Sequence, residues 1–216
     1  TFRGVAVLYV WDWLADVAAG ADRSPLPFPP LTIAGIAAAL TLFTKDEGIA
    51  LALVDDFAFA VIVTWQLAVR KLSVFGLVSK RTGLIGGLIG FALITLPWLW
   101  HRRQLPTTTE MTYFDRLSWQ SLRDGLETLP WALAHLAGRL WGEARVWGLH
   151  WWGAAVALVL VPRRAVSPPQ IWLLLDMLGA IAALVVAGMI APTPVEEHIG
   201  GSAHRFLLQI TPVAVL

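Results

Sequence analysis

The sequence contains no cysteine, and only 14% of its residues are charged. Without cysteine the chain can form neither a disulfide framework nor a thiolate metal site. Soluble domains usually have about 25% charged and about 45–50% apolar residues, whereas this chain is 57% hydrophobic. The scarcity of charge argues against an ordinary soluble domain and favours a membrane protein.

Other absences narrow the function further. The net charge is only +1, so there is no basic field to attract nucleic acid, and no nucleic-acid partner is expected. The sequence has no glycine-rich phosphate loop, no G-x-S-x-G and no Walker pattern, which argues against a soluble-type nucleotide site. No signal peptide is recognisable. The chain starts at Thr1 and ends inside an apolar run, so we expect a fragment of a larger polytopic protein.

Long apolar runs are what the sequence does contain. A spanning helix needs about 20 mainly apolar residues. Six apolar runs come close to this length, and a seventh starts near Phe206. The six cover residues 5–19, 31–43, 49–69, 84–100, 146–161 and 171–191. Twelve Trp residues suit the membrane–water interface. The pattern predicts an all-α, polytopic transmembrane helix bundle with about six to seven spanning helices.

The basic loops predict how this bundle is oriented. Lys and Arg in short loops favour the cytoplasm, and the loops at residues 70–81 and 163–164 share one side by the number of crossings. The opposite, extracytoplasmic side then receives the turn at Lys45, the segment 101–145 and the loop 192–204, although His101, Arg102 and Arg103 run against this rule. We expect residues 1–216 to form one transmembrane domain of a multi-pass protein in the bacterial cell (inner) membrane.

The segment 101–145 has a mixed composition. Leucines recur there at near-helical spacing, at Leu117, Leu122, Leu126 and Leu129. Several Trp residues in the same stretch suit a helix that lies on the bilayer. We therefore expect an amphipathic extracytoplasmic or interfacial segment without a catalytic role.

Three charged residues, Lys45, Asp46 and Glu47, stand side by side between two apolar runs. Ionisable groups at membrane depth are usually functional or paired. A Lys can bind a lipid-linked phosphate as a point charge, and either carboxylate could position that Lys or an acceptor. The alternative is an ordinary solvated turn whose Lys reaches the interface.

Further carboxylates lie within the apolar runs. Asp55 falls roughly under Glu47 on a helix and could line the same cavity, whereas Asp56 points about 100° away. One of the two is expected to face water or an Arg partner, unless they mark a re-entrant or frayed helix. The sequence indicates no partner for three other carboxylates, Asp12, Asp16 and Asp176.

The last polar stretch is "PTPVEEHIGGSAHRFLLQITP". Glu196, Glu197 and His198 match no standard zinc signature, so no metal site is predicted. We expect Arg205 to open the final helix, where its guanidinium could grip a phosphate with help from the positive helix terminus. The alternative is a polar periplasmic loop with an interfacial Arg.

Two stretches, "GIAAALTLFTKDEGIALALV" and "HIGGSAHRFLLQITP", together resemble the bacterial C-type (GT-C) integral membrane glycosyltransferases, relatives of the protein O-mannosyltransferases and aminoarabinose transferases. "LPWLWHRR" is similar to the family's Pro-Trp exit from a helix into a large extracytoplasmic loop. His204 stands where the family more often has Asp. The residues that match the family's motifs are Thr44, Lys45, Glu47, Gly48, His198, Ser202 and Arg205.

The resemblance implies transfer of a sugar from a polyprenyl-phosphate-linked donor to a glycan, lipid or protein acceptor outside the cytoplasm. No cofactor is expected, because the lipid-linked sugar is itself a substrate. The resemblance also implies that the catalytic carboxylate lies upstream of Thr1, and that Lys45 and Arg205 converge on the donor phosphate. Two alternatives remain: a transporter or flippase of lipid-linked sugars that uses intramembrane carboxylates for proton coupling, and a non-catalytic membrane assembly protein. The residues expected to bind substrate are Lys45, Asp46, Glu47, His198, Ser202 and Arg205.

Overall fold

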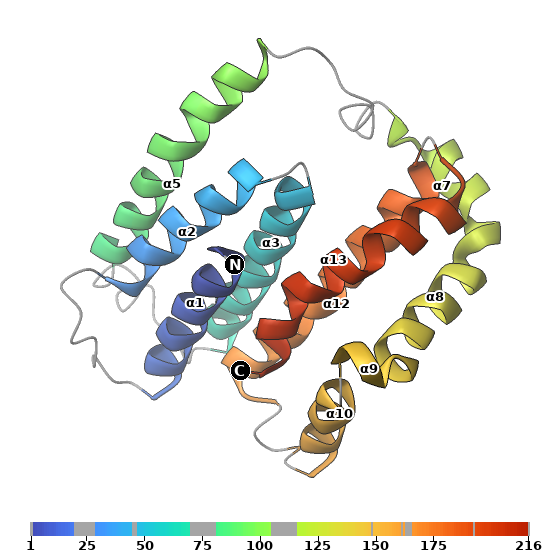
Figure 1. Cartoon of the computed structure of the whole chain (residues 1–216). Coiled ribbons are helices and arrows are strands. Elements are labelled where there is room, and N and C mark those ends of the chain that lie inside the picture. The colour runs from blue at the N-terminus through green and yellow to red at the C-terminus, as the bar shows by residue number, and fades with distance from the viewer. Residues whose placement is uncertain are drawn as a thin grey trace. The chain divides into compact units, whose positions relative to one another are not determined.

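The computed structural model of the chain describes residues 2–19, 29–44, 47–69, 81–104, 116–147, 149–160, 162, 166–191 and 193–215. All regular elements in these ranges are helical (Figure 1), which confirms the all-α prediction for the described part of the chain. The chain divides into two compact units. The first comprises Thr1–Leu105 and Arg163–Asp176 with Leu216, and the second comprises Pro106–Pro162 and Met177–Val215.

The first unit is organised around helix α2. This helix packs against three others, α1, α3 and α5. Trp13 of α1 also meets Phe59 of α3, with ring centroids 5.6 Å apart. The unit contains α1 (Phe2–Ala19), α2 (Pro30–Thr44), α3 (Glu47–Ala68), α5 (Arg81–Arg102) and α12 (Pro168–Ile190) as far as Asp176.

Glycines bring α2 and α5 into backbone contact. A Cβ added to Gly35 would lie 2.3 Å from the carbonyl oxygen of Gly87, and one added to Gly87 would lie 2.5 Å from that of Leu31. A Cβ on Gly86 would meet the Thr32 hydroxyl at 2.4 Å. Small residues at such contacts are typical of helices that associate within membranes, because they let the two backbones approach closely.

Three helices in the described ranges are long and apolar enough to cross a membrane: Gly48–Ala68, Gly83–Arg102 and Pro168–Ile190. They expose large apolar side chains such as Phe57, Leu88 and Leu93, as helices that face lipid do. The chain therefore has the character of a membrane protein. The count of six to seven spans stays a prediction.

Two of the predicted spans differ from expectation for identifiable reasons. Helix α1 has 18 residues, but Arg3, Asp12 and Asp16 interrupt its apolar surface. The run 146–161 is divided between α9 (Ala144–Trp147) and α10 (His150–Leu160). Since a span needs about 20 residues, the 11 residues of α10 are too few.

The second unit gathers shorter helices around α13. Helix α13 packs against α8, η3 and α10. At the start of α7, the Ser118 hydroxyl accepts a 3.1 Å hydrogen bond from the backbone N–H of Ser121 and caps the helix. The unit contains α7 (Trp119–Gly125), η2 (Leu126–Thr128), α8 (Leu129–Ala137), the single π-helical turn η3 (Gly138–Gly142), α9, α10, the remainder of α12, and α13 (Val195–Val215).

Candidate functional site

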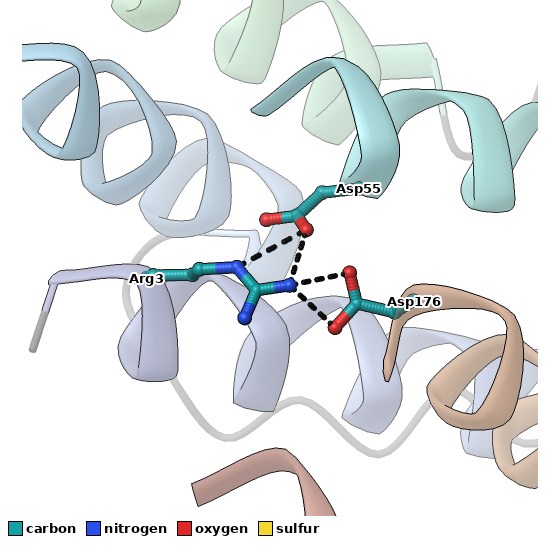
Figure 2. Close-up of polar contacts among 3 residues, drawn as sticks. All are labelled: Arg3, Asp55 and Asp176. Atoms are coloured by element: carbon teal, nitrogen blue, oxygen red, sulfur yellow. Dashed lines mark hydrogen bonds and ion pairs between the residues drawn. The ribbon is translucent and has the colours of Figure 1, made fainter. Parts of the chain in front are cut away.

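The first unit buries a cluster of three charged side chains, Arg3, Asp55 and Asp176 (Figure 2). Nη2 of Arg3 donates to both carboxylate oxygens of Asp176, at 2.7 and 2.8 Å. Asp55 Oδ1 accepts from the same Nη2 at 2.9 Å and from Nε at 3.3 Å. The cluster joins α1, α3 and α12, which lie far apart in the sequence.

Burial makes this ion-pair cluster energetically important. The side chains of Arg3 and Asp176 are 1% and 0% exposed, and that of Asp55 is 15% exposed. Charges inside a membrane bundle are costly unless they are paired, and removal of one partner leaves the others buried without compensation. The cluster therefore holds the three helices together, and it is also the type of intramembrane carboxylate site that can serve an ion pathway.

The sequence anticipated part of this cluster. Asp55 faces an Arg partner, as expected for one of the two adjacent aspartates, and Asp56 is exposed. Asp176, for which no partner was indicated, also pairs with Arg3. Arg3 itself was missed, although a lone Arg at one end of an apolar run is a signal that an intramembrane carboxylate lies nearby.

The predicted site at the turn between α2 and α3 is only partly described. Lys45 and Asp46 lie outside the described residues, and Glu47 begins α3 without a described side chain. Gly48 has a packing role, because a Cβ at this position would lie 2.4 Å from the carbonyl oxygen of Thr41. This glycine of the family-like motif therefore allows the close approach of two helix ends. Whether Asp55 lines a cavity with Glu47 stays a prediction.

Helix α13 carries the second predicted site, but it begins earlier than the sequence suggested. It starts at Val195, so the expectation that Arg205 opens the final helix is wrong. Proline before the helix and Glu196 and Glu197 in its first turn explain this start, since carboxylates favour the positive helix terminus. Arg205 therefore lies within the helix, away from the free backbone N–H groups of its first turn.

His198 and Ser202 are one helical turn apart and so share a face of α13. Ser202 is buried and His198 is half-buried. The side chain of Arg205 is not among those that the structure describes, and Lys45 lies outside the described residues. The convergence of these two cations on one phosphate therefore stays a prediction.

A polar cluster that sequence reasoning missed surrounds His204 in the second unit. Glu143 Oε2 lies 2.5 Å from His204 Nε2. The other Glu143 oxygen, Oε1, accepts from Arg139 Nη1, and Arg139 Nε donates to His135 Nε2 at 3.2 Å. His135 in turn stacks on Trp131, with ring centroids 4.9 Å apart. The chain of contacts links α8 and η3 to α13.

The charge state of this cluster centres on Glu143. Burial alone would raise the pKa of the Glu143 carboxyl, but the hydrogen bonds from His204 and Arg139 outweigh it and lower this pKa below its usual value. The pairing of Arg139 with Glu143 at i, i+4 was visible in the sequence as a helix-surface spacing. The contact with His204, 61 residues away, had no such signal.

In the described parts of the chain, no group of three or more His, Cys, Asp or Glu side chains is arranged to hold a metal ion. Comparison of the chain with family models, with curated proteins and with solved structures gave no match.

Proposed function

We propose that this chain is part of a membrane glycosyltransferase that moves a sugar from a polyprenyl-phosphate-linked donor to an acceptor on the extracytoplasmic side of the bacterial inner membrane. The three membrane-length helices and the two motifs that resemble the C-type glycosyltransferases support this proposal. On this proposal the full bundle has six to seven spans.

The observation that carries the proposal is the polar content of α13. The sequence of this one helix brings together His198, Ser202, His204 and Arg205. Imidazole, hydroxyl and guanidinium groups together suit a phosphate, because they donate hydrogen bonds and add positive charge.

The chemistry that these groups would support is displacement at the anomeric carbon. The bond between that carbon and the phosphate oxygen breaks, and the acceptor oxygen forms the new glycosidic bond. The acceptor proton passes to a carboxylate base, and polyprenyl phosphate leaves with the bonding electrons. Arg205 and Lys45 would stabilise the negative charge that grows on the leaving phosphate.

The test is sugar transfer in proteoliposomes that contain the full-length protein and a radiolabelled polyprenyl-phosphate sugar. Arg205→Ala is expected to lower the transfer rate by about 10²–10³-fold, the usual loss when a group that stabilises transition-state charge is removed. Arg205→Lys should recover part of the rate. Arg145→Ala, which changes an exposed Arg of the second unit, is the matched control and should leave the rate unchanged. Absence of transfer by the wild type would overturn the proposal, and equal rates for Arg205→Ala and Arg145→Ala would overturn the role of Arg205.

The cluster of Arg3, Asp55 and Asp176 specifically favours a second candidate, a transporter or flippase of lipid-linked sugars. Intramembrane carboxylates mark proton pathways in many transporters. A flippase would move a fluorescent lipid-linked sugar across the bilayer without breaking its phosphate bond, and Asp55→Asn would stop that movement. Movement without transfer in the same vesicles would favour this candidate over the transferase.

A further inference from the structure

The second unit contains a cavity of about 330 Å³, and none of the residues of the two charged clusters lines it. It lies between the α7–η2 segment on one side and the end of α12 with the start of α13 on the other. Ligand sites in proteins usually measure about 300–1,000 Å³. The cavity therefore has room for a single small ring and not for a chain of several.

The floor of the cavity is apolar and closely packed. Gly125, Ile190 and Val195 are buried there. A Cβ added to Gly125 would lie 2.6 Å from the Cβ of Met189, so the glycine allows α7 to rest directly on α12. This contact gives the cavity a fixed wall.

The rim, in contrast, is polar. Ser121, Asp124 and Thr128 recur at a spacing of three and four residues and so lie on one face of the α7–η2 segment. Arg116 and Thr193 complete the rim. A carboxylate, a guanidinium and three hydroxyl groups therefore border one small apolar floor.

Two of the groups on the rim, Arg116 and Asp124, are charged. Within the described part of the chain, the side chains of Arg116 and Asp124 make no hydrogen bond or ion pair. The hydroxyl groups are partly engaged: Ser121 contacts Ser118 at 2.8 Å, and Thr128 donates to the Gly125 carbonyl at 2.8 Å. Each hydroxyl oxygen can still accept a further hydrogen bond.

The chemistry of the rim selects the class of ligand. Arg116 and Asp124 together carry no net charge, so the site has no preference for an anion, and the carboxylate would repel one. A carboxylate can accept hydrogen bonds from two neighbouring hydroxyls, while a guanidinium donates to ring or hydroxyl oxygens. An apolar floor suits the C–H face of a sugar ring. These features fit a neutral polyhydroxylated ring.

We propose that this cavity binds one neutral monosaccharide unit, with Asp124 and Arg116 as the residues that recognise its hydroxyl groups. The inference rests on the proposed function in one respect: that function makes a sugar the natural ligand of the cavity. Thr193 and Val195 in its wall precede His198 by a few residues, so the cavity adjoins the first turns of α13. On the proposed function it is the subsite for the sugar, next to the helix that receives the phosphate.

The test is saturation-transfer NMR of the purified chain in detergent micelles with glucose, mannose and galactose as separate probes. At least one should bind with a dissociation constant of about 1–10 mM, the weak range expected for a single ring with few contacts. Asp124→Asn and Arg116→Gln should each weaken binding at least about tenfold, because each removes a charge-assisted hydrogen bond.

Matched controls lie in the same segment. Glu127→Gln and Arg123→Gln change exposed charges of α7–η2 that do not border the cavity, and both should bind like the wild type. Circular dichroism should show equal helix content for all four variants, since Asp124 and Arg116 are exposed. Glucuronate, an anionic analogue, should bind more weakly than glucose.

Absence of binding by the wild type to all three sugars would overturn the inference, and so would equal binding by Asp124→Asn and Glu127→Gln. The result is separable from that of the transfer assay. If binding depends on Asp124 but the wild-type full-length protein transfers no sugar, the cavity assignment stands and the transferase proposal fails. If transfer depends on Arg205 but Asp124→Asn binds sugar normally, the transferase proposal stands and the cavity assignment fails.

Discussion

Replacement of Arg3 by Met removes a charge from the centre of the first unit but keeps most of the apolar stem. In the native chain, four contacts of 2.7–3.3 Å join this guanidinium to Asp55 and Asp176. After the substitution the two carboxylates remain close together without a cation. Loss of one partner from a buried ion pair costs about 3–5 kcal/mol, which shifts the ratio of unfolded to folded chain by about 10²–10³·⁵.

The measurement is the free energy of unfolding in detergent–lipid micelles, taken from the loss of helix packing as SDS is added. Asp56→Asn is the matched control, because this carboxylate adjoins Asp55 on α3 but is exposed, and its effect should stay within about 0.5 kcal/mol. If Arg3→Met unfolds no more readily than Asp56→Asn, the cluster does not hold the helices together and the reasoning fails.

A double-mutant cycle sharpens the test. Asp176→Asn removes the carboxylate that is wholly buried, so Arg3→Met should cost less in that background than in the wild type. A coupling free energy of about 0.5–3 kcal/mol is typical of residues in one network. Additive costs would show that the two side chains act independently.

Three further predictions concern packing, protonation and capping. Gly87→Ala should lower the free energy of unfolding by about 1–3 kcal/mol, because the added Cβ would overlap the Leu31 carbonyl. Gly153→Ala is the control and should not destabilise the chain, because nothing lies within 4 Å of its added Cβ. Equal unfolding curves for the two variants would contradict this prediction. The lowered pKa of Glu143 means that its pairing stabilises the fold above the ordinary carboxyl pKa and that this contribution is lost as pH falls through the lowered value. Glu143→Gln should therefore flatten the acid limb of a plot of stability against pH, and Glu127→Gln should not; unchanged acid limbs in both would refute the pairing. Ser118→Ala should cost about 1 kcal/mol through loss of the cap and speed amide exchange in α7, which hydrogen-exchange mass spectrometry would detect.

How far the sequence predicts this fold depends on the distance over which each interaction acts. Apolar composition and helical spacing are local, and they gave the all-α class and three membrane-length helices. The start of α13 was misjudged because the charged and polar residues before Arg205 suggested a loop, yet the helix begins at Val195 and continues through Gly200 and Gly201. Packing of its buried positions, Ile199 and Ala203 among them, offsets the low helix propensity of glycine.

The partners within the charged clusters, in contrast, could not be predicted from local sequence patterns. One of Asp55 and Asp56 was expected to face water or an Arg, but the choice of Asp55 and of Arg3 depends on contacts across 52 and 173 residues. The pairing of Glu143 with His204 likewise depends on how the π-helical turn η3 packs against α13. Such contacts follow from the arrangement of whole helices, which local spacing does not encode.

The close contact between the glycines of α2 and α5 limits how far these two helices can move relative to each other. Where Gly35 meets Gly87, main-chain atoms alone set the spacing of the two helices. Most neighbouring helices can shift a little when intervening side chains change rotamer, but here no side chain intervenes to give that freedom. At this point the two helices are therefore expected to keep their spacing more strictly than helices that are separated by side chains.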